Sequence, residues 1–430
     1  MDTLLPAISI GGTLILLLIG APIWVAFLFG GASVLLLDMG VPLQTIAQFA
    51  FSSVESYPLL AVPFFVLSGA LLVRGGGMTP LRVLVGKTVA RRSAGLPALV
   101  IVMAAVLGAV SGSSVACMAI LAAVMLPLFT SAGLDRAHGA GIIAVASELG
   151  LIIPPSVFLI VFGAANQVSI GDLFIGGMSA GILLALCMLP FAIPRGRAEI
   201  QAAMAAAAPA DPLTLGDVAR VVPLLLFPVV ILGGIYGGIM SPTESASIAV
   251  FYALALGLFV YRGLTFRLLN DALEETVRLT ALVYFLLFGA DMLARLFSYL
   301  ELPRAITSLV LDLGLAGGGF MLAVTLFLLV LGMFFSSLPM VVVVLPLLLP
   351  TARSLGIDQV YFGIVGVICA TLGGLTPPFS PQLWIAGPIC GVPMGQILRQ
   401  ALPFIAAWLI GLGLLLAFPQ IVTVPVAALR

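Results

Sequence analysis

The stretch ELGLIIPP, residues 148–155, returns 223 positions later as TLGGLTPP, residues 371–378. Each copy places two adjacent prolines inside a long apolar run. Because proline lacks an N–H and clashes with the preceding turn, each pair is expected to break a helix and free backbone carbonyls. GLD at residues 133–135 returns with the same spacing as GID at residues 356–358. The pattern indicates an internal repeat in which each half contains a broken helix.

The composition places these broken helices in a membrane. Of the 430 residues, 62% are hydrophobic and 8% are charged, with 17 basic and 17 acidic side chains. A soluble domain usually carries about 25% charged residues. The composition therefore excludes a water-soluble enzyme, a disordered protein and a protein that binds nucleic acid. It predicts an all-α polytopic protein whose main surroundings are the lipid bilayer.

The apolar runs predict about ten transmembrane helices, because a span needs about 20 mostly apolar residues. Two further stretches, 96–131 and 318–350, are interrupted by small polar residues, and their halves are short for full spans. We expect them to be re-entrant helical hairpins, whose polar tips must be buried in protein or line a cavity. The positive-inside rule then places 13 of the 17 basic residues in the cytoplasm.

The predicted spans and hairpins divide the chain into two halves, each with scaffold helices followed by a transport part. The expected segments are 1–73, scaffold helices of repeat 1; 74–95, a cytoplasmic amphipathic arm; 96–193, transport half 1 with hairpin 96–131 and broken helix 139–168; 194–220, a cytoplasmic linker; 221–297, scaffold helices of repeat 2 with an amphipathic segment 265–279; 298–317, an arm; 318–420, transport half 2 with hairpin 318–350 and broken helix 359–391; and 421–430, a tail.

The number of crossings between the two copies sets their relative orientation. Five full spans and one hairpin are expected between Asp135 and Asp358. Five is odd, so equivalent elements should face opposite sides of the membrane. Inverted repeats with interrupted helices that meet at the midplane are typical of secondary transporters.

The hairpin tips carry the polar residues that could bind a ligand. The first tip is SGSS, residues 111–114, and the second is FFSSLP, residues 334–339. Carbonyls and hydroxyls at such interruptions suit a hard cation, and helix N-termini suit a carboxylate. The alternatives are a small-residue packing face at the tips and structural kinks at the prolines. Glu148 is open to interpretation as a residue that tunes a site or carries a proton, since its repeat mate is Thr371.

These motifs, together with SPTES at residues 241–245, resemble those of the large membrane subunit of TRAP (tripartite ATP-independent periplasmic) transporters. The resemblance covers essentially the whole chain in order. It implies a sodium-driven importer of organic acids such as C4-dicarboxylates or sialic acid in the bacterial inner membrane, working by an elevator movement. The implied partners are a small four-helix membrane subunit and a periplasmic substrate-binding protein. No enzymatic activity and no organic cofactor are expected.

The resemblance also assigns site residues, most of them through backbone carbonyls. The implied ligands of one Na⁺ are Ser111, Ser114, Gly150, Ile153 and Pro155. The implied ligands of the second Na⁺ are Gly332, Gly373, Thr376 and Phe379. Substrate is expected near Ser113, Ser337 and Pro378.

Three other functions fit parts of the pattern. A single-component carboxylate transporter, coupled to Na⁺ or H⁺, could share the inverted hairpins. An intramembrane protease could use a serine of SGSS, but the chain has one histidine, His138, and no HExxH motif. A passive channel would not exchange one solute for another, so a counterflow assay would distinguish it.

Overall fold

The structure is a computed structural model that describes residues 4–89, 95–131, 133–192, 214–378 and 380–429. Every regular element in these ranges is helical. Eight of the helices are long and apolar enough to span a membrane, and shorter apolar helices of 10–17 residues accompany them. The all-α membrane fold is thus confirmed for the described residues, whereas the number of about ten spans stays a prediction.

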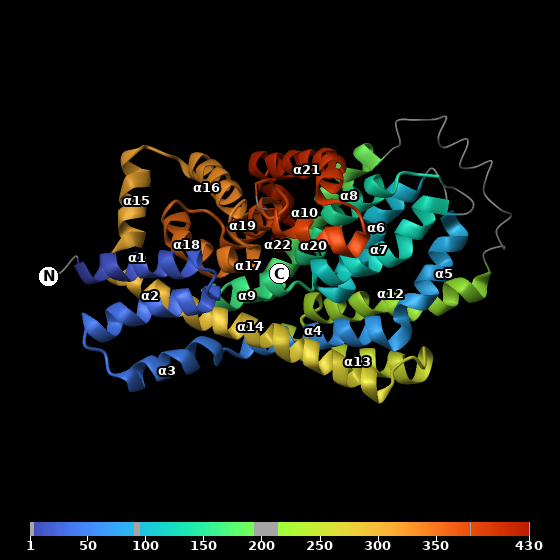
Figure 1. Cartoon of the computed structure of the whole chain (residues 1–430), viewed down its shortest axis with the longest axis horizontal. Coiled ribbons are helices and arrows are strands. Elements are labelled where there is room, and N and C mark those ends of the chain that lie inside the picture. The colour runs from blue at the N-terminus through green and yellow to red at the C-terminus, as the bar shows by residue number, and fades with distance from the viewer. Residues whose placement is uncertain (1–3, 90–94, 132, 193–213, 379, 430) are drawn as a thin grey trace.

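Long helices form one side of the molecule, the lower side in Figure 1. The longest, α14, runs across this layer and packs against α2, α3 and α4, while α13 packs against α4. Most of its residues belong to the segments 1–73 and 221–297. Its helices and their connections are α1 (Leu4–Leu18), α2 (Ile23–Leu37), α3 (Leu43–Val54), η1 (Tyr57–Leu60), α4 (Ala61–Leu72), the π-helical turn η2 (Val73–Gly77), α12 (Leu215–Tyr236), α13 (Pro242–Ala255), η5 (Leu256–Val260) and α14 (Phe266–Tyr299). The segments expected as arms contain α5 (Met78–Val89) and α15 (Leu302–Asp312), and α15 lies at the upper left of Figure 1.

Two helical hairpins, each followed by a broken helix, make up most of the opposite side. The first set is α6 (Leu96–Ser111), α7 (Ser114–Ser131), α8 (Arg136–Ala146), η4 (Ser147–Leu151), α9 (Val157–Asn166) and α10 (Ile170–Ala192). The second set is α16 (Gly317–Gly332), α17 (Ser337–Pro339), η6 (Met340–Val344), α18 (Leu345–Ser354), α19 (Gln359–Gly373), α20 (Pro381–Cys390), α21 (Met394–Ala417) and α22 (Gln420–Leu429).

The GLD and GID motifs perform the same structural task in the two halves. Gly133 and Gly356 adopt left-handed φ values of 70° and 71°, which a residue without a Cβ tolerates best. Each ends the second arm of a hairpin. Two residues later Asp135 and Asp358 cap the next helix by accepting backbone N–H groups, at 2.9 Å from Ala137 and 2.8 Å from Tyr361. The repeat detected in the sequence is therefore a repeat of local structure.

Two boundaries in the scaffold differ from those expected. The amphipathic segment 265–279 and the span after it form one continuous helix, α14, of 34 residues. Thr265 caps its start, and no proline follows within it to force a break. The end of the expected linker 194–220 is also helical, since α12 begins at Leu215; residues 193–213 lie outside the described residues.

The segments expected as an arm and a tail contain helices. Residues 298–317 include α15, which begins with a proline in its first turn. Residues 421–430 lie almost wholly in α22, which packs against α10 and α19 and buries Val422 and Val426. The C-terminal segment therefore covers the hairpin layer rather than extending from it.

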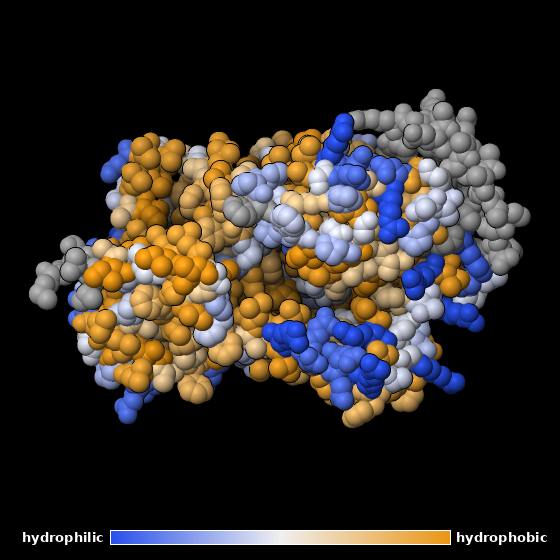
Figure 2. Space-filling model, in the orientation of Figure 1, coloured by the Kyte–Doolittle hydropathy of each residue, from blue (hydrophilic) through white to orange (hydrophobic). Residues whose placement is uncertain are grey.

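The end of the molecule that contains α1 to α3 presents a largely apolar surface (Figure 2). Leu18, Ile19, Leu43 and Phe51 on this end are each more than 70% exposed. In water such a surface would aggregate, whereas in a bilayer it faces lipid tails or other apolar helices. Hydrophilic side chains in this view gather instead on the other half of the molecule.

Candidate functional site

Each hairpin meets its broken helix through a pair of glycines. A Cβ added to Gly108 of α6 would lie 2.7 Å from the Cα of Gly150 in the first broken helix. A Cβ added to Gly332 of α16 would lie 2.7 Å from the Cα of Gly373 in the second. Only glycine allows two backbones to approach this closely. The two halves thus place a hairpin tip against a helix break by the same contact.

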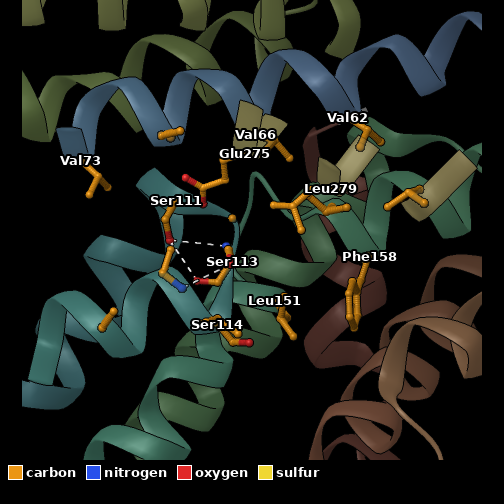
Figure 3. Close-up of a pocket in the computed structure, with 18 of the residues that line it drawn as sticks. Val62, Val66, Val73, Ser111, Ser113, Ser114, Leu151, Phe158, Glu275 and Leu279 are labelled. Carbon is orange, nitrogen blue, oxygen red and sulfur yellow. Dashed lines mark hydrogen bonds between the residues drawn. The ribbon is translucent and has the colours of Figure 1, made fainter. Parts of the chain in front are cut away.

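The first tip reverses the chain within two residues. Gly112 ends α6 with a left-handed φ of 59°, and a Cβ there would lie 2.8 Å from the carbonyl oxygen of Pro155. Ser111 Oγ accepts a hydrogen bond from the N–H of Ser113 at 3.4 Å (Figure 3). Ser114 begins α7, and its Oγ accepts a 3.4 Å hydrogen bond from Nε2 of Gln382 in α20. The tip therefore contacts both helix breaks.

The first break leaves backbone carbonyls without their usual helical donors. Pro154 and Pro155 have no N–H groups, so they cannot donate to the carbonyls of Gly150 and Leu151. Ser156 partly compensates, since its Oγ donates to the Leu151 carbonyl at 2.5 Å and caps α9. Ile153 is 3% exposed, and its N–H donates to the Leu149 carbonyl at 2.8 Å.

The second break is built from a different set of polar contacts. Thr376 Oγ1 donates to the carbonyl of Gly373 at 2.8 Å, and the Thr376 N–H donates to the same oxygen at 3.0 Å. Ser337 of the second tip is buried and donates to the carbonyl of Ala370 at 2.9 Å. Pro378 is exposed, and Phe379 lies outside the described residues.

These groups are oxygen ligands of the kind that unwound transporter helices present to Na⁺. Among the described residues, no three His, Cys, Asp or Glu side chains gather into a cluster that could hold a metal ion. A fully buried carboxylate, that of Glu148, lies in the first broken helix with neither oxygen hydrogen-bonded. The carbonyl, hydroxyl and carboxyl oxygens at the first break are of a kind that fits a hard cation such as Na⁺.

Comparison with known proteins decides the family. The family model of the DctM component of tripartite ATP-independent periplasmic transporters matches residues 10–421. The chain belongs to this family. It is thus a TRAP large subunit, a transporter permease and not an enzyme, and its family works with a small membrane subunit and a periplasmic binding protein.

Relatives of this chain are named for different substrates. The chain is 34% identical to the C4-dicarboxylate TRAP transporter large permease protein DctM of Pseudomonas aeruginosa, over 91% of each protein. It is 31% identical to the sialic acid TRAP transporter large permease protein SiaM of Vibrio cholerae, over 96% of each. Among solved structures, the YdaH transporter of Alcanivorax borkumensis matches 90% of each chain with a TM-score of 0.62 and 18% identity, which shows a shared fold.

A cavity of about 450 Å³ in this TRAP subunit lies beside the contact between the first tip and α4. Its walls come from α4 and α14 on one side and from α6, α7 and α9 on the other (Figure 3). Of the residues assigned by resemblance, the cavity is lined by Ser111, Ser113 and Ser114. Ser337 and Pro378 do not line it. The tip thus faces a space large enough for a small organic molecule.

Three polar residues of this cavity were not among the predicted site residues. Gln382 lies in α20 and reaches the first tip, as its contact with Ser114 shows. Arg74 and Glu275 line the scaffold side, with Arg74 Nη2 2.8 Å from Glu275 Oε2. A polar side chain inside the apolar run 359–391 was the available signal for Gln382. The other two were assigned only to the cytoplasmic surface.

Proposed function

We propose that this chain is the large subunit of a sodium-coupled importer of organic acids in the bacterial inner membrane. A small four-helix subunit and a periplasmic binding protein complete the transporter. The observation that carries the proposal is the pair of matching contacts between hairpin tips and broken helices, Gly108 with Gly150 and Gly332 with Gly373. Each contact lies where freed carbonyls and hydroxyls are available to a cation.

The assigned sodium ligands fall into two groups around these contacts. Ser111, Ser114, Gly150, Ile153 and Pro155 belong to the first tip and break, and Gly332, Gly373, Thr376 and Phe379 to the second. When bound, the ion would supply positive charge that offsets the unpaired carbonyls and holds a tip against its break. The proposal of an anionic substrate rests on relatives whose names specify C4-dicarboxylate and sialic acid.

The proposed movement is that of an elevator. The hairpins and broken helices would move as a body against the layer formed by α4, α13 and α14. The cavity between the first tip and α4 lies at the boundary between these two parts. The substrate would be carried on the moving part near Ser113, which lines this cavity, and Ser337 and Pro378 of the second half are the other proposed contacts. A single-component carboxylate transporter is the second candidate, and it would take up substrate when both partner proteins are absent.

Thermal unfolding of the purified protein tests the sodium sites without a substrate. We expect a higher midpoint in NaCl than in KCl at equal ionic strength, and a smaller difference in Thr376→Ala. A ligand that binds only the folded state at a hundredfold excess over Kd stabilises it by about 2.7 kcal/mol. Thr130→Ala is the matched control, since its Oγ1 also donates to a backbone carbonyl, that of Leu126, but far from either break. Equal midpoints in both salts for the wild type would contradict sodium binding by this subunit alone.

A further inference from the structure

Glu148 is a buried carboxylate without a hydrogen-bonding partner. Its side chain is 0% exposed, and no described residue donates a hydrogen bond to Oε1 or Oε2. It lies in η4, the last turn before the first break, which packs against α6 and α7. An isolated ionised carboxylate is strongly unfavourable in such a place, so the group is either protonated or neutralised by a cation.

The surrounding helices offer no described side-chain cation to pair with it. The helices α6, α7 and α9 contain no Lys or Arg. In α8, Arg136 lies in the first turn, at the opposite end from Glu148, and donates to the Cys390 carbonyl at 3.0 Å. His138 of the same turn bonds Gln400 at 3.2 Å. The first turn of α10 contains an acid, Asp172.

The turn that contains Glu148 packs against both arms of the first hairpin, α6 and α7. Two residues after Glu148, a Cβ added to Gly150 would lie 3.2 Å from the Cα of Gly108 and 3.6 Å from the carbonyl oxygen of Ser113. Ser114 of α7 interacts electrostatically with the Glu148 carboxyl group. Ser114 is itself one of the proposed sodium ligands. The carboxylate is therefore placed beside the oxygen-rich contact between the tip and the break.

The second half of the repeat has a neutral residue at the position equivalent to Glu148. Thr371, the repeat mate, is also 0% exposed, but its Oγ1 donates to the carbonyl of Ile368 at 2.9 Å. A neutral hydroxyl satisfied by its own helix requires no further partner. Glu148 at the equivalent place brings a carboxyl group that its helix cannot satisfy. The two breaks thus differ by one ionisable carboxyl group.

We propose that Glu148 supplies a carboxylate to the cation site between the first hairpin tip and the first break, as an oxygen ligand and counter-charge that the second site lacks. The inference rests on the sodium coupling proposed above. A monovalent cation would neutralise the carboxylate, and the carboxylate would strengthen binding of the cation. The first site would therefore bind Na⁺ more tightly than a site built from carbonyls and hydroxyls alone.

The test measures thermal unfolding of the purified full chain as Na⁺ replaces choline at constant ionic strength. Glu148→Gln and Glu148→Thr are compared with the parent in a Thr376→Ala background, which weakens the second site. Thr371→Val is the matched control. We expect the half-saturating Na⁺ concentration to rise by about tenfold or more in both Glu148 variants, which is about 1.4 kcal/mol of binding free energy. The control should leave it unchanged.

The thermal unfolding midpoint in choline distinguishes a role of Glu148 in Na⁺ binding from a purely structural role. Removing an uncompensated buried charge should leave the Glu148 variants at least as stable as the parent when Na⁺ is absent. A midpoint lowered equally in choline and in Na⁺, with an unchanged half-saturating concentration, would overturn the inference while leaving sodium coupling intact. Absence of any Na⁺ effect in wild type and variants would overturn both.

Discussion

Alanine in place of Gly332 is expected to reduce sodium-driven uptake by at least about tenfold, with the protein still inserted in the membrane. The added Cβ would lie 2.7 Å from the Cα of Gly373 and 3.3 Å from its carbonyl carbon. Both are backbone atoms of the broken helix, so neither can turn away as a flexible side chain would. Overpacking of this kind costs about 1–3 kcal/mol, and about 1.4 kcal/mol corresponds to a factor of ten. The measurement is initial uptake per inserted transporter.

The matched control for this prediction lies in the same helix. Gly318 of α16 has no atom within 4 Å of the position its Cβ would occupy, so Gly318→Ala should transport normally. Gly108→Ala should match Gly332→Ala, because its Cβ would lie 2.7 Å from the Cα of Gly150. Normal uptake by both Gly332→Ala and Gly108→Ala would show that the contacts between the hairpin tips and the helix breaks are not required for transport.

Valine in place of Gly69 is expected to cause a comparable loss by a different route. Gly69 lies in α4 of the scaffold, and a Cβ there would lie 3.0 Å from the carbonyl oxygen and 3.2 Å from the Cα of Ser111. The branched side chain would push the first hairpin away from α4, together with the broken helix that contacts it through Gly108 and Gly150. Because this contact joins the two parts proposed to move past each other, we expect uptake to fall by about tenfold or more.

Na⁺-dependent thermal stabilisation distinguishes Gly69→Val from Gly332→Ala and Gly108→Ala. Gly69→Val leaves the contact between Gly108 and Gly150 in place, so its Na⁺-dependent thermal stabilisation should remain close to that of the wild type. Gly332→Ala should reduce that stabilisation. Gly413→Val is the control, since Gly413 of α21 is exposed and has open space at its Cβ. If Gly69→Val lost both uptake and Na⁺-dependent stabilisation, the result would contradict a role for Gly69 at the moving boundary.

The sequence was sufficient to predict the repeated parts of the fold. A pair of prolines has few physical outcomes within a helix, and Asp135 and Asp358 are capping residues in the same local context. Helix lengths in the scaffold were harder to predict. The change from charged to apolar residues within 265–299 suggested two elements, but no Gly or Pro lies where they would have to separate, and one helix results.

The candidate site was predictable only where the backbone defines it. Ser111, Ser113 and Ser114 were found because they interrupt an apolar run, and they line the cavity. Gln382 was missed because its role depends on contact with Ser114, which is 268 positions away in the chain. Arg74 and Glu275 were missed for the same reason, since positions 201 residues apart meet only in the folded protein.

The most direct test is uptake into proteoliposomes that contain this chain and its small subunit, with the binding protein outside. The substrates would be radiolabelled succinate and sialic acid, each supplied with a candidate binding protein under an inward Na⁺ or K⁺ gradient. We predict accumulation of one acid under the Na⁺ gradient, and none when K⁺ replaces Na⁺ or when either partner is omitted. Accumulation by this chain alone, or at the same rate without a Na⁺ gradient, would contradict a sodium-coupled tripartite importer.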